Sequence, residues 1–294
     1  MEDSEALATS YSEALATSYS FNKILFKAKC IKPIIFKLFF NLIKEPIRDI
    51  AFHLTKSGIE SKHYDIFNNI QCILNLHENK FEDYYIDDIF TDGIYIGFNT
   101  INMVKILKGI TVKDKYITFC IKGTPENFKF SVEINGSCNG CKLSADVDLI
   151  DIEPQQFNIP DLHEYPLIID INSKDLQTIV SQLKTVSHEQ SRSQDIEIMF
   201  YNNILSFTIP NNIYGSEIKI EKAYEIRPEY MHNYKNVIYA INIKLQTLIN
   251  LTKTPNLSPN IIIYMDNNQP VFFEYKIGTL GEFIIGMNTI EDDD

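Results

Sequence analysis

The chain has 294 residues, of which 45% are hydrophobic and 22% are charged, enough apolar material for one large or two medium-sized globular domains. Its formal charge is −12, with 39 Asp and Glu residues against 27 Lys and Arg residues. Eight of the acids lie in residues 1–20 and 291–294, and removing these eight charges leaves −4 for residues 21–290, so the acidic total does not exclude a polyanionic partner.

The chain begins with a short tandem repeat. The octapeptide SEALATSY occupies residues 4–11 and again residues 12–19. A perfect duplication of small and polar residues is typical of a tail and not of a folding unit. We therefore expect residues 1–20 to lie outside the fold.

From Phe21 onward, a pattern of one strand, one helix and several further strands recurs four times, with predicted helix starts about 65–75 residues apart. Ser173 is expected to cap the third helix. The leading strands are predicted at 23–30, 93–99, 166–172 and 237–243, and the helices at 31–45, 99–110, 174–187 and 244–254. Further strands are predicted at 47–54, 70–77, 116–123, 128–135, 196–201, 204–210, 260–265 and 270–277.

The segment DLIDIEPQQFNIPDLHEY, residues 148–165, interrupts this pattern. It is rich in acids and proline and has no hydrophobic period, which is typical of a connector between domains. The sequence thus predicts two similar domains, residues 21–147 and 166–290, each with two strand-helix-strands units, and an acidic tail at 291–294. The expected fold class is α+β.

Each predicted helix has one apolar face. In NTINMVKILKGI, residues 99–110, the side chains of Met103, Ile106 and Leu107 share that face because they are three and four residues apart. The corresponding stripes are Ile31, Ile34, Ile35, Leu38 and Leu42 in the first helix, Leu176, Ile179, Val180 and Leu183 in the third, and Leu245, Leu248 and Ile249 in the fourth.

The opposite faces carry lysine, amide and hydroxyl groups. The one acid among them is Asp175, in a first turn, where the helix dipole favours negative charge. In a single helix this would be an ordinary solvated face, but four such helices in an acidic chain favour a surface that faces a polyanion. These residues are Lys37, Asn41 and Lys44, then Asn102, Lys105 and Lys108, then Lys174, Thr178, Ser181 and Lys184, then Gln246, Asn250 and Lys253.

Four segments carry a resemblance to the family of DNA sliding clamps known as proliferating cell nuclear antigen (PCNA). The ending PVFFEYKIGTLGEFIIGMNTIEDDD, residues 270–294, resembles the family's closing pattern of a Pro-led strand into EYKI, a Gly-containing turn, a last strand and an acidic tail. Residues 99–109 resemble its second helix, residues 148–165 its interdomain connector, and KSGIESKHYD, residues 56–65, the stretch after its first helix. The resemblance covers residues 23–294. Outside these four segments the sequence is divergent, which suggests an outlying member of the family, for which a large DNA virus is a candidate source.

The resemblance implies a homotrimeric ring around duplex DNA, with helices lining the hole and sheets outside. Such a ring tethers DNA polymerase and other replication and repair enzymes, is placed on DNA by a clamp loader, and has no chemistry or cofactor of its own. In the third helix, Thr178 and Ser181 stand where the family commonly has arginines. The lysines expected to meet DNA phosphates are Lys37, Lys44, Lys105, Lys108, Lys174, Lys184 and Lys253.

The family's partner site is a hydrophobic pocket under the connector that receives a short client peptide with aromatic anchors. The residues alone are equally compatible with Phe157 and Ile159 simply fixing the connector to the sheet. Ile285 and Asn288 differ from the usual Tyr and Pro, which predicts altered client preference. Carried over by position, the pocket comprises Tyr64, Phe157, Ile159, Pro160, Pro270, Ile285, Met287 and Ile290.

Ring closure in the family pairs edge strands of adjacent subunits, here expected at 141–148 and 215–222. Asp146 and Asp148 would then face Lys219 and Lys222, although exposed pairs of this kind add only ~0–1 kcal/mol each. Eukaryotic clamps carry a ubiquitin-accepting lysine in the region matching roughly 200–203. This chain has no lysine between Lys184 and Lys219, so we expect no such modification there.

Other sites find weaker support in the sequence. Cys138 and Cys141 form one CxxC, but a zinc site usually needs a second pair or suitably spaced histidines, and the six histidines are scattered. The acidic run EDYYIDDIFTD, residues 82–92, could bind a cation but is expected to be a solvated loop between strands. The nucleotide-binding and hydrolase motifs GxGxxG, GxxxxGK[ST], HExxH and GxSxG are absent, so an enzyme such as a nuclease or phosphatase is the weaker class.

The chain also lacks the usual signs of a membrane or secreted protein. No apolar run approaches the ~18–20 residues that span a bilayer, the N-terminus has no secretory pattern, and five scattered cysteines predict reduced thiols. We expect a soluble protein of the nucleus or of a cytoplasmic viral replication site, with no membrane partner. The alternative to a homotrimer is a clamp-fold processivity or checkpoint subunit that acts as a monomer or in a heterotrimer.

Overall fold

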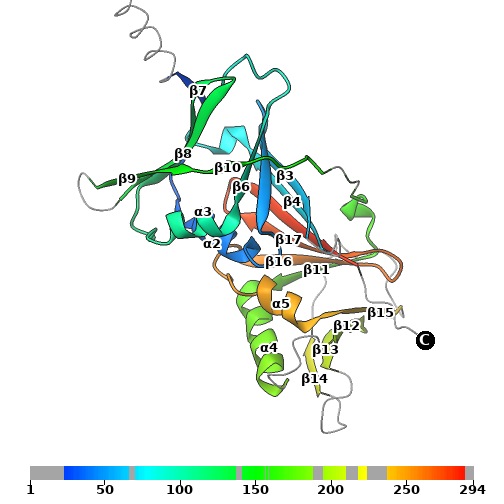
Figure 1. Ribbon diagram of the computed structural model, residues 1–294. Helices are drawn as coiled ribbons and strands as arrows, with labels where there is room; N and C mark the ends of the chain where they lie inside the picture. Colours follow the sequence, from blue (N-terminus) through cyan, green and yellow to red (C-terminus); the bar gives the residue numbers. More distant parts are fainter. Residues whose placement is uncertain are drawn as a thin grey trace, which may run out of the picture. The chain divides into compact units, whose positions relative to one another are not determined.

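The computed structural model, shown in Figure 1, divides into two compact units. The first unit comprises Met1–Lys37, Asp49–Glu60 and Leu76–Glu153, and the second comprises Leu38–Arg48, Ser61–Asn75 and Pro154–Asp294. The structure describes residues 23–65, 70–136, 141–155, 157, 159–187, 195–209, 218–223 and 237–288. The octapeptide repeat, Cys138, Ile290, the side chain of Lys222 and the acidic tail lie outside the described residues.

The first unit contains an antiparallel sheet of five strands in the order β5-β1-β7-β8-β9. Four further strands of this unit pair in the order β10-β6-β2-β3, and β10 is the part of the connector that pairs with β6. The elements are β1 (Ile24–Cys30), α2 (Ile34–Ile43), β2 (Asp49–Leu54), β3 (Gly58–Tyr64), a 3₁₀ turn (Glu78–Lys80), β5 (Asp83–Ile86), β6 (Ile94–Asn99), α3 (Thr100–Leu107), β7 (Tyr116–Thr124), β8 (Asn127–Asn135), β9 (Lys142–Val147) and β10 (Leu149–Ile150).

The second unit repeats this plan with a four-stranded sheet, β14-β13-β12-β15, and the run β4-β18-β17-β16-β11. Residues of α2, β3 and β4 occur in both units. The elements are β4 (Ile70–His77), a 3₁₀ turn (Leu162–Glu164), β11 (Leu167–Asn172), α4 (Ser173–Val186), β12 (Asp195–Tyr201), β13 (Ile204–Ile209), β14 (Ile218–Ala223), β15 (Tyr239–Lys244), α5 (Leu245–Leu251), β16 (Asn260–Met265), β17 (Val271–Ile277) and β18 (Gly281–Met287).

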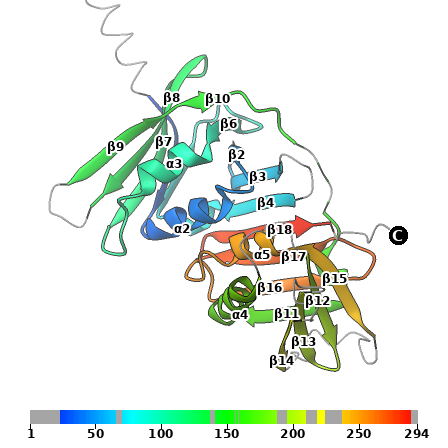
Figure 2. The same cartoon turned by 60° about the horizontal axis from the view of Figure 1, so that its bottom comes forward.

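All four predicted helices are present, and each follows its leading strand directly or after three residues. The stripe predicted for α4 is confirmed, because Leu176, Ile179, Val180 and Leu183 are all buried. Burying side chains of this size contributes about 1.5–3 kcal/mol each, enough to hold a helix whose other face is polar. In both views of the molecule α4 lies beside α5 (Figures 1 and 2), and the Gln177 side chain donates to the Thr252 carbonyl at 3.0 Å.

The stripe predicted for the first helix was wrong in part. Ile31 precedes α2 and is exposed, and Leu38 is only half-buried. Three phenylalanines of α2 compete for the same buried positions, and their larger apolar surface turns the helix so that they face inward. The buried residues of α2 are Ile35, Phe36, Phe39, Phe40, Leu42 and Ile43.

Two local predictions also need correction. The acidic run at 82–92 is not simply a loop, because β5 pairs with β1 within it, and Lys27 and Lys23 form ion pairs of 2.6 Å with Asp83 and Asp87. The cap of α4 is Asn172 and not Ser173. The Asn172 side chain accepts from two backbone N–H groups of the first turn, whereas Ser173 is buried and donates to the Ser258 carbonyl at 2.6 Å.

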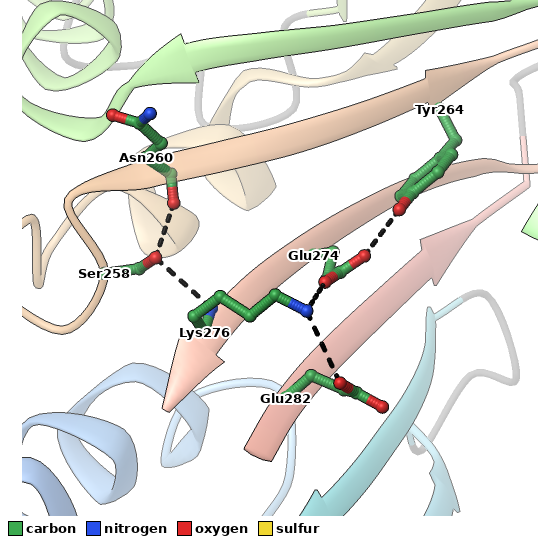
Figure 3. A network of polar contacts seen from close by, with 6 residues as sticks. All are labelled: Ser258, Asn260, Tyr264, Glu274, Lys276 and Glu282. Carbon is green, nitrogen blue, oxygen red and sulfur yellow. Dashed lines mark hydrogen bonds and ion pairs between the residues drawn. The ribbon is translucent and has the colours of Figure 1, made fainter. Parts of the chain in front are cut away.

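The closing motif EYKI forms the second half of β17, and the side chains of Glu274 and Lys276 bind neighbouring strands (Figure 3). Glu274 is buried, accepts a hydrogen bond of 2.5 Å from the Tyr264 hydroxyl of β16, and forms an ion pair with Lys276. Lys276 also reaches Glu282 of β18 at 3.4 Å. The Tyr275 hydroxyl donates to the Leu251 carbonyl at the end of α5 at 3.1 Å. The motif therefore links three strands and one helix of the second unit.

Candidate functional site

The exposed face of α3 carries the lysines predicted there. Asn99 caps the helix by accepting hydrogen bonds from the backbone N–H groups of Ile101 and Asn102 at 3.1 and 3.2 Å. Met103 and Leu107 are buried, and this places Lys105 and Lys108 on the exposed side. The Lys105 ammonium donates to the Asn102 side-chain oxygen at 3.3 Å, a contact within the same face.

Lys37 does not behave as the sequence suggested. Its ammonium donates to the backbone carbonyls of Lys108 and Ile110 at 2.8 and 2.7 Å, at the C-terminal end of α3. The side chain is half-buried. It thus has backbone partners in the fold, which a sequence pattern read one helix at a time could not indicate.

In the second unit, some of the lysines predicted to meet DNA are exposed without an ion pair among the described residues, and others already contact the protein. Lys174 and Lys184 lie on the exposed face of α4 with Thr178 and Ser181. The Lys253 ammonium, after α5, lies 3.7 Å from the Glu45 carboxylate, at the end of the segment predicted as the first helix and just beyond α2. Among the described residues, no ion pair joins a carboxylate to Lys105, Lys108, Lys174 or Lys184. Lys44 donates to the Asn41 side chain at 3.3 Å.

The connector is fixed at its start to the first unit. Leu149 and Ile150 of β10 pair with Phe98 and Gly97 of β6. A Cβ atom at Gly97 would lie 2.4 Å from the Ile150 carbonyl oxygen, so only glycine permits this approach.

The middle of the connector contacts Tyr64, the last residue of β3. The backbone N–H of Tyr64 donates to the Gln155 side chain at 2.6 Å, and the rings of Tyr64 and Phe157 pack with centroids 4.6 Å apart and an interplanar angle of 51°. Both rings are half-buried and therefore retain accessible apolar surface. The structure thus brings together two residues predicted for the partner pocket although 93 positions separate them in the sequence.

The end of the connector packs on a core cluster of the second unit that consists of Tyr165, Ile168, Tyr264 and Phe272. Ile159 contacts this cluster from the outside. The Tyr165 hydroxyl donates to the Pro270 carbonyl at 2.9 Å, and burial raises the pKa of Tyr165 to about 12, so this donor keeps its proton at neutral pH.

The remaining residues predicted for the pocket fall into two groups. Pro160 and Pro270 are half-buried and retain surface. Ile285 and Met287 of β18 are 0% and 4% exposed, so they belong to the core beneath any surface site and offer a ligand almost nothing to touch. Ile285 points inward because alternate residues of β18 face the core. A residue assigned to the pocket only because it matches a position in the family need not face the surface.

The predicted edge strands lie at the ends of their sheets. In the described part of the chain, β9 pairs only with β8, and β14 pairs only with β13 (Figure 2). Asp146 and Asp148 are exposed on or next to β9, and Asp146 lies 3.8 Å from Lys129. Lys219 is exposed on β14 and forms an ion pair of 2.8 Å with Glu221.

A surface cavity of about 440 Å³ opens beside β9. Leu143 and the exposed thiol of Cys141 line it from the strand, and Ile106 and Ile110 line it from the α3 side. The described residues contain no group of three or more His, Cys, Asp or Glu side chains arranged to hold a metal ion. No helix among them is long and apolar enough to cross a membrane.

Comparison with known proteins accounts for both halves of the chain. The family model "Proliferating cell nuclear antigen, N-terminal domain" matches residues 25–156, and the model for the C-terminal domain of the same protein matches residues 158–286. The chain belongs to the PCNA family. Its fold is the α+β clamp fold, and its membership supports the prediction of a sliding clamp that is not an enzyme.

Individual members of the PCNA family are similar over nearly the whole chain. A probable DNA polymerase sliding clamp of Paramecium bursaria Chlorella virus 1 is 20% identical over 270 residues, which cover 90% of this chain and 97% of that protein. The proliferating cell nuclear antigen of Dictyostelium discoideum is 23% identical over 262 residues, covering 87% and 96% respectively. The crystal structure of the Entamoeba histolytica antigen superposes with a TM-score of 0.76 at 18% identity, covering 92% of this chain and all of that one.

Proposed function

We propose that this PCNA-family clamp closes into a homotrimeric ring around duplex DNA and tethers DNA polymerase and other client proteins to it. The observation that carries the proposal is that β9 in one unit and β14 in the other each stand at an edge of their sheet within the described part of the chain. An exposed edge strand presents a row of backbone donors and acceptors to another strand, and two different edges on one chain suit a head-to-tail contact. Residues 21–147 and 166–290 would be the two clamp domains, joined by the connector at 148–165.

The helix faces supply the second part of the proposal. Lys105, Lys108, Lys174 and Lys184 are exposed, and no carboxylate among the described residues pairs with them. Lysines of this kind interact with phosphates through salt-dependent contacts that carry no sequence information, which is what sliding requires. Lys44, which donates to Asn41, and Lys253, which pairs with Glu45, would add positive charge to this surface.

The connector supplies the client site. The half-buried rings of Tyr64 and Phe157, with Ile159, Pro160 and Pro270, offer apolar surface to an aromatic-anchored peptide. A clamp loader would place the ring on DNA in the nucleus or at a viral replication site. The second candidate is a clamp-fold subunit that acts as a monomer or in a heterotrimer. It is favoured by the charged side chains of Lys219 and Glu221 on β14, because charges on an edge strand disfavour pairing with another strand.

Solution mass measured by light scattering over a concentration series tests ring closure. Since one chain has a mass of 34.0 kDa, a trimer has about three times that mass. Leu143→Lys places a charge on the accessible apolar side chain of β9 and should shift the particle toward one subunit. The matched control is Ile89→Lys, because Ile89 is 46% exposed in the same unit and follows β5, the strand at the opposite edge of the sheet from β9. A wild-type monomer at every concentration would refute self-closure and favour the second candidate.

A further inference from the structure

The end of α3 needs partners that its own sequence does not supply. The last carbonyls of any α-helix lack intrahelical donors. Here the chain leaves α3 through Lys108, whose N–H donates to the Lys105 carbonyl at 3.3 Å, and the Ile110 N–H donates to the Leu107 carbonyl at 3.0 Å. The carbonyls of Lys108 and Ile110 are then left for an outside donor.

Lys37 of α2 is that donor. Its ammonium binds both carbonyls, at 2.8 and 2.7 Å, across 71 and 73 residues of sequence. A cation at a helix C-terminus is also favoured by the helix dipole, and hydrogen bonds from an ionised donor are roughly twice as strong as neutral ones. One side chain thus fastens the turn that carries Lys105 and Lys108.

We propose that Lys37 is a positioning residue that holds the C-terminal turn of α3 in place and so fixes the direction of Lys105 and Lys108, and that it is not itself a phosphate contact. The proposal rests on the proposed function, because DNA is the ligand for which the two exposed lysines are held. It assigns different roles to lysines that look alike in the sequence: Lys37 acts on the protein backbone, and Lys105 and Lys108 act on the ligand.

Amide hydrogen exchange in the free protein tests the structural half. Lys37→Met removes both hydrogen bonds and should speed exchange of the amides at 105–110 by about tenfold or more, because charged hydrogen bonds hold this turn closed. Lys37→Arg can still donate to two carbonyls and should recover most of the protection. Lys44→Met is the matched control, one residue beyond the end of α2. Because the Lys44 ammonium bonds to Asn41 and not to α3, exchange at 105–110 should stay within about twofold.

Binding to a short fluorescent duplex as a function of salt tests the other half. Removing a phosphate contact lowers the slope of log K against log salt by about 0.9, and Lys105→Met should show this loss. Lys37→Met should instead weaken binding severalfold with the slope unchanged, because the number of phosphates contacted stays the same while the turn must be ordered on binding.

The outcomes separate the roles. A slope that falls by about 0.9 in Lys37→Met with exchange unchanged would make Lys37 a direct phosphate contact and overturn the proposal. Unchanged exchange and unchanged binding would overturn it as well. If the wild-type chain binds no duplex at any salt concentration, the proposed function fails, whereas the exchange of residues 105–110 still decides whether Lys37 holds α3. Lys37→Arg, which keeps the charge, guards against a loss of folding in Lys37→Met.

Discussion

The closing strand offers a quantitative test of how the fold is held together. The perturbation is Glu274→Ala, which removes a buried carboxylate that accepts from the Tyr264 hydroxyl and pairs with Lys276 (Figure 3). Two milder variants separate the contribution of the hydrogen bond from that of the charge. Glu274→Gln keeps an acceptor for Tyr264 and loses the charge, and Tyr264→Phe keeps the charge and loses the donor.

The geometry sets the expected magnitudes. A hydrogen bond to a charged, buried acceptor contributes about 1.5–3 kcal/mol, and its loss leaves the Tyr264 hydroxyl without an acceptor. The ion pair adds only ~0–1 kcal/mol, because the Lys276 side chain is 54% exposed and water screens it. We therefore expect the free energy of unfolding to fall by about 2–4 kcal/mol in Glu274→Ala and by about 0.5–1.5 kcal/mol in Glu274→Gln.

Urea unfolding of the single variants and of the double variant Tyr264→Phe/Glu274→Ala gives the coupling between the two side chains. Since they share one hydrogen bond, the double variant should lose roughly 1–2 kcal/mol less than the sum of the single losses. Losses that add to within ~0.3 kcal/mol would show that the Tyr264 hydroxyl and the Glu274 carboxylate do not stabilise each other.

Three further outcomes follow from the structure. The hydrogen bond from Lys23 holds the pKa of Asp87 below its usual value. The stabilisation that the Asp87 carboxylate gives the folded state is therefore present above about pH 4 and is lost as the pH falls through the lower, folded-state pKa. Acid unfolding of Asp87→Asn should be less steep than that of wild type, and an unchanged profile would contradict this. In a Cys138→Ser background, alkylation of the exposed Cys141 thiol should slow as the protein concentration rises, since assembly along β9 covers it, whereas a constant rate would argue against that edge. Phe157→Ala should weaken binding of an aromatic-anchored peptide about tenfold, while Ile285→Val should cost about 1 kcal/mol of stability and leave peptide affinity within about twofold; equal losses of affinity would mean that Ile285 reaches the ligand.

Much of the fold was predictable because it depends on short-range patterns. Strands with dense apolar residues, such as β16 at 260–265, were found at their observed limits, and the period of α4 placed all four buried residues correctly. A hairpin such as β12–β13 is equally local, since Asn202 and Asn203 take up positive φ angles of 49° and 64° in a two-residue turn between the strands.

What could not be predicted depends on residues distant in sequence. Lys37 looks like any solvent-facing lysine until α3 is placed beside it, and Glu45 becomes relevant to Lys253 only through an approach across 208 positions. Strand β5 has an acidic sequence with no clear strand pattern, and it is recognisable only from its pairing with β1, where Lys27 compensates the charge of Asp83. The resemblance to known clamps located the connector, but it could not say that Ile285 faces the core.

The proposed contact between β9 of one copy and β14 of the next would have a consequence for mixtures of normal and defective copies. A head-to-tail contact is directional, so a copy with a blocked β9 can still offer β14 to a neighbour. Such a copy occupies one end of a growing assembly and gives the next copy nothing to join. One defective chain would thus remove up to two sound ones from circulation as an open fragment. A ring closed in the proposed way from a single kind of chain would therefore be sensitive to a minority of faulty copies.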